Sequence, residues 1–131
     1  MITGTSQRRD AYQTDAVTTA GPAQLIQMLY DRTLTAVSRS QVALGAEPPN
    51  IETAHRELTR AQDIIMELSL SLDHEQGGPI AASMAALYEF CHRTLVSANA
   101  SKDLSQLGAV EKVIQDLRSA WVEACLPESL A

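Results

Sequence analysis

Aromatic side chains are scarce in this sequence, since one Trp, three Tyr and one Phe make up only 4% of its 131 residues. Apolar residues nevertheless reach 45%, so Leu, Ile, Val, Met and Ala must supply most of the buried surface. This composition favours helices over sheets. The length is typical of one domain with its own hydrophobic core.

The sequence also lacks the usual marks of secretion, membrane insertion and disulfide scaffolding. Arg8 and Arg9 are followed by polar residues and not by the apolar stretch of a signal peptide. No apolar run is long enough to span a membrane. The two cysteines, Cys91 and Cys125, have no C-x-x-C or zinc-ligand spacing around them. We therefore expect a cytoplasmic protein without direct membrane insertion.

A concentrated positive charge, as found in nucleic-acid-binding proteins, is missing as well. The net charge is -6, the isoelectric point is near 4.9, and the ten Lys and Arg residues are scattered along the chain. Such a balance repels phosphate backbones. We expect neither a nucleic acid partner nor attraction to anionic lipid.

Four long segments instead show the apolar periodicity of helices. Two of them start at Gly-Pro pairs, Gly21-Pro22 and Gly78-Pro79, where Gly can cap a helix and Pro fits its first position. Asn50 marks a third start. The predicted helices span about residues 22–45, 50–73, 79–100 and 103–125.

Short loops between helices of similar length favour an all-α, antiparallel, up-down-up-down four-helix bundle. We expect this bundle to occupy residues 22–126. The polar residues 1–21 are predicted to form a mobile N-terminal arm or cap, and residues 127–131 a C-terminal tail. Cys91 and Trp121 fall on apolar stripes and are predicted to be core residues.

Two Glu-x-x-His pairs, Glu52 with His55 and Glu89 with His92, match the ligand pattern of di-iron bundles. At about 100° per residue both glutamates point away from the apolar stripes, and their heights in the bundle differ by roughly 16 Å. We interpret them as surface residues. Motifs for phosphate binding, serine hydrolysis and zinc proteolysis are missing too. We expect no cofactor, no metal and no enzyme activity, with a di-iron protein as an alternative.

Several apolar side chains lie away from the predicted core stripes. Met66 and Leu70 are roughly 120° and 160° from the stripe of their helix, with Ile64 on its flank, and Phe90 and Val96 are displaced on the next helix. Contiguous apolar surface usually marks a binding site. A helix or extended segment of another protein could lie there. The alternatives are that the arm covers this surface or that it forms a structural dimer.

Motifs along the chain resemble those of the flagellar secretion chaperone family, FliS. Residues 12–31, YQTDAVTTAGPAQLIQMLYD, are similar to the family's opening signature. Further matches follow in the family's order and spacing, among them Ser71-Leu72-Asp73, Gly77-Gly78, Leu87-Tyr88, Ala98-Asn99 and Ala120-Trp121. Ser69 and Phe90 depart from the pattern, which commonly has Asn and Tyr at these positions.

The resemblance implies a chaperone that binds the disordered C-terminal segment of flagellin in the cytoplasm and prevents premature polymerisation. It also implies delivery of the client to the flagellar type III export apparatus at the membrane, by a monomer or weak homodimer. The arm is similar to the family's N-terminal cap, which we expect to compete with the client. The expected partner-binding residues are Tyr12, Gln13, Val17, Ile64, Leu68, Leu70, Tyr88 and Val96.

Overall fold

The structure is a computed structural model that describes the backbone of residues 21–130 and the side chains of residues 21–125. Over this range it consists of helices and connecting turns, without strands. The helices are α2 (Pro22–Gly45), α3 (Ile51–Leu70), α4 (His74–Ser101) and α5 (Leu107–Leu130), and a short 3-10 helix, η1 (Leu104–Gln106), precedes α5. The predicted arm, apart from Gly21, lies outside the described residues.

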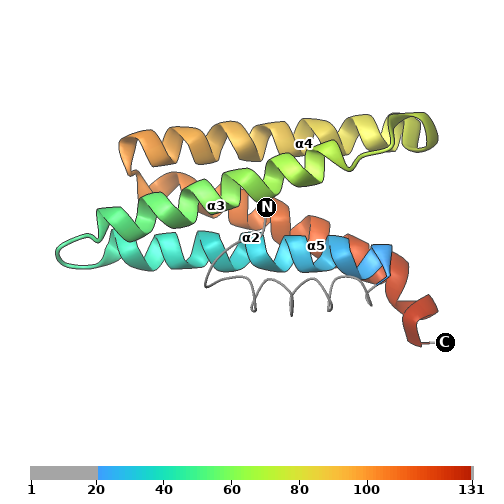
Figure 1. The fold of residues 1–131 in the computed structure, drawn as a ribbon, viewed down its shortest axis with the longest axis horizontal. Helices are drawn as coiled ribbons and strands as arrows, with labels where there is room; N and C mark the ends of the chain where they lie inside the picture. Colours follow the sequence, from blue (N-terminus) through green and yellow to red (C-terminus); the bar gives the residue numbers. More distant parts are fainter. Residues whose placement is uncertain (1–20, 131) are drawn as a thin grey trace, which may run out of the picture.

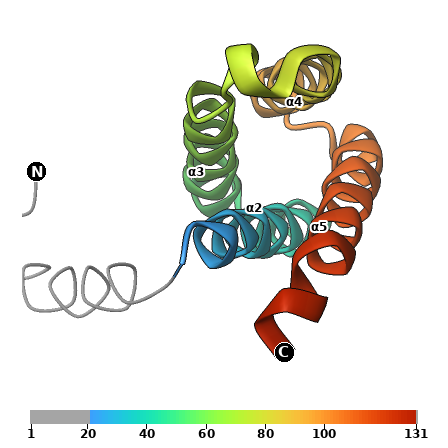
Figure 2. The same cartoon turned by 90° about the vertical axis from the view of Figure 1, so that its right-hand side faces the viewer.

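The four helices form an antiparallel bundle. Successive helices run in opposite directions (Figure 1), and an end-on view places α2 opposite α4 and α3 opposite α5 (Figure 2). Contacts at the ends agree with this order, because Trp121 near the end of α5 donates a hydrogen bond to the carbonyl oxygen of Ala23 at the start of α2, at 2.7 Å. The predicted all-α bundle is confirmed.

Local capping explains where the helices begin. Pro22 is the first residue of α2 and follows Gly21, as predicted. The Asn50 side chain accepts a hydrogen bond from the Thr53 amide at 3.0 Å and so satisfies one of the free N–H groups at the start of α3. Asp103 caps η1 in the same way through the Ser105 amide, at 2.9 Å.

The boundary between α3 and α4 differs from the prediction. Helix α3 ends at Leu70 and not near residue 73, and α4 begins at His74 and not at Pro79. Asp73 is the reason, since its carboxylate accepts a hydrogen bond from the Gln76 amide at 3.0 Å and starts the helix one turn early. Gly78, at φ 49° and ψ -126°, then makes a kink inside α4.

The end of α5 also differs from the prediction. Its backbone continues to Leu130, whereas the sequence suggested an end near residue 125 followed by a tail. No glycine follows Gly108 in this segment, so no residue there favours the left-handed conformation that often ends a helix. The helical part of the chain therefore includes most of the predicted tail.

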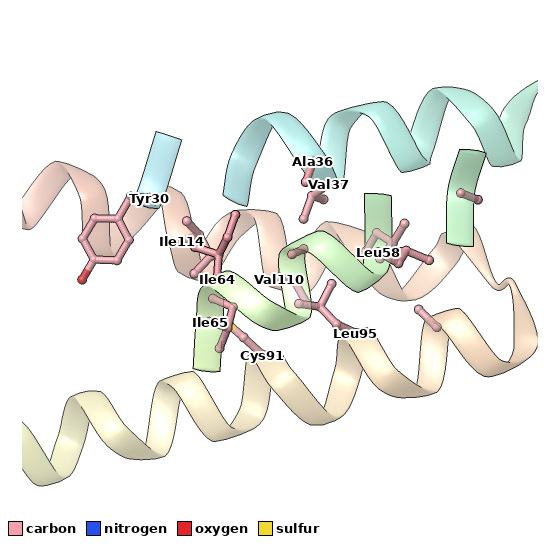
Figure 3. Packing of buried hydrophobic residues seen from close by; sticks show 14 of the residues in the cluster. Tyr30, Ala36, Val37, Leu58, Ile64, Ile65, Cys91, Leu95, Val110 and Ile114 are labelled. Carbon is pink, nitrogen blue, oxygen red and sulfur yellow. The ribbon is translucent and has the colours of Figure 1, made fainter. Parts of the chain in front are cut away.

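The core contains apolar side chains from all four helices (Figure 3). Each helix contributes a fully buried side chain: Val37 of α2, Leu58 of α3, Leu95 of α4 and Ile114 of α5. Cys91 is fully buried among them, as predicted, and its thiol pKa is raised to about 11 because burial penalises the thiolate. Trp121 packs against this core while remaining partly exposed.

A buried hydrogen bond crosses the bundle between helices on opposite corners. The hydroxyl oxygens of Tyr30 on α2 and Tyr88 on α4 lie 2.6 Å apart, and both residues are almost completely buried. Each hydroxyl thus provides the hydrogen-bond partner that the other needs in the buried interior. Burial raises the pKa of both tyrosines, because the phenolate would lose its hydration.

Replacing one tyrosine should therefore cost more than replacing both. Tyr88→Phe leaves the Tyr30 hydroxyl buried without a partner, and we expect a loss of about 1–3 kcal/mol in the free energy of unfolding. The double variant Tyr30→Phe, Tyr88→Phe removes both polar groups and should recover most of this loss. Urea denaturation of the wild type, both single variants and the double variant measures the coupling. Additive losses would contradict a coupled buried pair.

Candidate functional site

An apolar pocket of about 370 Å³ opens at the end of the bundle where α3 turns into α4. Its walls come from the start of α2, the α3–α4 turn, the first turns of α4 and the last part of α5. The apolar lining residues are Ile26, Leu72, Ile80, Ala81, Met84, Tyr88 and Trp121, and Ser71, Asp73, Gln76 and Gly77 complete the lining. We call this the end pocket.

The end pocket is built on fixed groups. Tyr88 lines it while being only 2% exposed, so this side chain forms its floor, and its hydroxyl is held by Tyr30. The Trp121 indole is held by its hydrogen bond to the Ala23 carbonyl oxygen. A cavity with such a framework binds an apolar group without first having to order its own walls.

Two glycines shape the wall made by α4. A Cβ added at Gly77 would lie 2.8 Å from the Cβ of Ala81, so the turn packs too closely for a side chain. Gly78 has a positive φ of 49°, which side chains rarely tolerate. The kink at Gly78 sets the direction in which the following residues, including Ile80, leave the α3–α4 turn.

Large apolar side chains remain exposed along α3 and α4. Leu70, the last residue of α3, is 80% exposed, and Ile80 on the pocket wall is 71% exposed. Exposed apolar groups of this size indicate a binding surface when they accumulate on neighbouring elements. We call the set the α3–α4 apolar residues: Met66, Leu70, Ile80, Leu87, Phe90 and Val96.

The structure separates the predicted partner-binding residues into three groups. Leu70 and Val96 are exposed, as the helical periodicity predicted. Ile64, Leu68 and Tyr88 are buried in the core, so in this structure the first two stabilise the bundle and Tyr88 supports the end pocket. Their contact with a partner stays a prediction. Tyr12, Gln13 and Val17 lie outside the described residues.

The sequence did not indicate that Ile80 and Trp121 form part of a pocket. Ile80 follows the apolar spacing of its helix, yet it is exposed on the pocket wall, two residues after the kink at Gly78. Trp121 was expected in the core, which it touches with part of its surface. The Gly77-Gly78-Pro79 sequence is the signal that could have indicated an irregular helix at this point.

The Glu-x-x-His pairs do not come together. Glu52 and Glu89 are exposed, as predicted from their positions on the helices. His55 instead lies 3.2 Å from the Asn99 side-chain oxygen, where α3 meets the end of α4. In the described part of the chain, no three His, Cys, Asp or Glu side chains are placed to hold a metal ion. Nor does any described helix combine the length and apolar character needed to cross a membrane.

Fold and site together define a class, a helical-bundle protein with a preformed apolar pocket and exposed apolar residues on two of its helices. Comparison with known sequences identifies the family within that class. The chain matches the family described as flagellar protein FliS over residues 5–128, and it belongs to this family.

Similar proteins carry names that belong to the same family. A protein named flagellar secretion chaperone FliS from Bacillus subtilis is 36% identical over 90% of this chain and 86% of its own. The protein of the same name from Salmonella typhimurium is 35% identical over 81% of this chain and 78% of its own. These names describe a chaperone family and not an enzyme family.

A solved structure agrees with the fold. A crystal structure of a flagellar chaperone from bacteria superposes with a TM-score of 0.74 over 95% of this chain and 99% of that chain. At 18% sequence identity, this likeness supports the helical-bundle architecture alone.

The kink at Gly78 can be tested by substitution. Gly78→Ala places a side chain at a positive φ, and we expect a loss of about 1–3 kcal/mol in the free energy of unfolding. Gly108→Ala is the matched control, because its added Cβ has no atom within 4 Å and an alanine helps the first turn of α5. Urea denaturation compares the two. Equal stability of both variants would contradict a required glycine at residue 78.

Proposed function

We propose that this protein is a cytoplasmic export chaperone for flagellin. It binds the disordered C-terminal segment of newly made flagellin, prevents premature polymerisation and keeps the client competent for flagellar type III secretion. The observation that carries this proposal is the end pocket together with the exposed α3–α4 apolar residues, in a chain whose relatives are named flagellar secretion chaperones.

Coupled folding and binding explains why a chaperone of this kind needs a long apolar track. A disordered client loses chain entropy when it becomes ordered on the bundle, typically about 2–5 kcal/mol or more of the gross interaction energy. Each large apolar side chain that becomes buried returns about 1.5–3 kcal/mol. Several such contacts along α3 and α4 hold the client while leaving the affinity low enough for release.

In this proposal, Leu70 and Val96 contact the client directly from α3 and α4. Ile80, Leu87 and Phe90 are further exposed apolar residues of α4 that a client could cover. Ile64, Leu68 and Tyr88 take part through contacts that open only when a client approaches, or by supporting the exposed residues from within. The second partner is the flagellar export apparatus at the membrane, and the free protein is a monomer or weak homodimer.

The attachment point of the N-terminal arm supports the proposal that the arm competes with the client. The α2 helix starts beside the end pocket, since Ile26 lines it and Ala23 is bonded to Trp121. Val17 precedes Gly21 by four residues, a reach of at most about 14 Å. Tyr12, Gln13 and Val17 can therefore cover apolar groups near this end when no client is bound, which lowers the apparent affinity.

A substitution at Leu70 tests the client surface. Leu70→Asp places a charge on a side chain that is 80% exposed, so the bundle should keep its melting temperature while binding of a flagellin C-terminal peptide weakens at least about tenfold. Isothermal titration calorimetry and thermal unfolding provide the two readouts.

Val42→Asp is the matched control for this test. Val42 is 71% exposed and lies near the opposite end of the bundle, so its substitution adds the same charge away from the proposed surface. Unchanged peptide binding by Leu70→Asp, or equal weakening by Val42→Asp, would contradict the proposed site. If the protein purifies without flagellin and elutes as a dimer on size-exclusion chromatography, the structural dimer is favoured instead.

Removal of residues 1–17 tests the role of the arm. If arm and client compete for the same apolar groups, the shortened chain should bind the flagellin peptide more tightly. The apparent Kd should fall in proportion to the fraction of molecules whose groove is free of the arm in the full chain. The same calorimetric titration measures the change. Weaker binding after the deletion would make the arm a part of the client interface.

A further inference from the structure

A second pocket, of about 420 Å³, lies between α2 and α3 and has a different chemistry from the end pocket. Three arginines line it, Arg32 and Arg39 from α2 and Arg60 from α3. Asp31, Thr35, Ala36 and Glu57 complete the lining. We call this the arginine pocket. It shares no lining residue with the end pocket, so the two can be occupied together.

The charge presented by this pocket is positive, although the whole chain has a net charge of -6. Of its two carboxylates, Asp31 forms an ion pair with Arg118 of α5. The other, Glu57, is only 4% exposed. The three arginines, in contrast, are exposed. A ligand approaching the α2–α3 side therefore meets three guanidinium groups and one accessible carboxylate, Asp31, which is already paired with Arg118.

Glu57 has an unusual position behind these arginines. Its Oε1 atom is buried without a hydrogen-bond partner among the described residues. The nearest guanidinium nitrogens are those of Arg60, 3.8 Å from Oε1, and Arg56, 3.9 Å from Oε2, which are too far for hydrogen bonds. Glu57 thus supplies the opposite charge that lets guanidinium groups gather, while their N–H donors stay available.

The donors and acceptors of the pocket indicate which ligand it fits. Guanidinium groups bind carboxylates through paired hydrogen bonds. The free acceptor on Glu57 requires an N–H donor, which a peptide backbone offers and a phosphate group does not. A phosphate chain offers no N–H donor and therefore gains nothing from that acceptor.

We propose that the arginine pocket is a second protein-binding site, which takes an acidic peptide segment of a partner protein. Aspartate or glutamate side chains of the segment pair with Arg32, Arg39 and Arg60. A backbone N–H of the segment donates to Glu57 when Arg60 turns toward the ligand carboxylate. The chaperone can then hold an apolar client at one end and an acidic segment on the α2–α3 side at the same time.

Fluorescence anisotropy with a fluorescein-labelled hexaglutamate peptide tests this site on the full chain. We expect saturable binding at low salt that weakens as salt increases, because the contacts are between charges. Thr35→Asp puts a carboxylate into the pocket from an exposed helical position and should weaken binding at least tenfold. Ser97→Asp, also exposed but on α4, adds the same charge elsewhere and should change binding less than twofold.

Removing a guanidinium gives an independent test. Arg39→Gln and Arg60→Gln should each weaken hexaglutamate binding several-fold, whereas Arg93→Gln, an exposed arginine of α4 outside the pocket, should not. Absence of saturable binding would overturn the proposal. So would equal losses in the Arg93→Gln and Arg39→Gln variants, or binding of a labelled oligothymidylate or of phosphatidylglycerol vesicles as tight as that of hexaglutamate.

Discussion

The hydrogen bond between Tyr30 and Tyr88 is the interaction on which the arrangement of the bundle depends. It joins α2 to α4 across the bundle, between helices that are not neighbours in the end-on view (Figure 2). Tyr88 contacts the core on one side and lines the end pocket on the other. Two of the few aromatic residues in the chain are used here, where large rigid side chains must reach across the whole interior. The depth of the pocket is therefore set by a polar pair inside an otherwise aliphatic core.

Much of the fold follows from residues that act locally, but the kink inside α4 does not. Pro22 and Asn50 mark helix starts by themselves, because the chemistry of capping depends on the nearest few residues. Between α3 and α4, two start signals compete. Asp73 begins the helix, and Gly78 can remain inside it only because a glycine tolerates φ 49°. Both signals are present in the sequence, and the pattern alone does not decide which of them begins the helix.

Part of the candidate site could likewise be predicted from local sequence, and part depends on how the helices pack. The exposure of Leu70 and Val96 follows from the helical period alone. Ile64 lies on the flank of its stripe, where the position of the adjacent helix decides between surface and core, and in this bundle it is buried. The end pocket could not be predicted, because Ile26, Leu72 and Trp121 come from three separate parts of the chain that only the folded bundle brings together.

A protein that exposes side chains such as Leu70 and Ile80 must also avoid binding itself through them. Acidic residues lie next to these groups in the sequence, with Glu67 beside Met66 and Glu89 beside Phe90, and both are exposed. Two copies that met through this surface would bring like charges together, on top of the repulsion from a net charge of -6 each. A client need not carry the same charges. The acidic surroundings therefore favour binding of a foreign apolar segment over binding of a second copy. The arginine pocket differs from this surface because its lining carries three positive side chains.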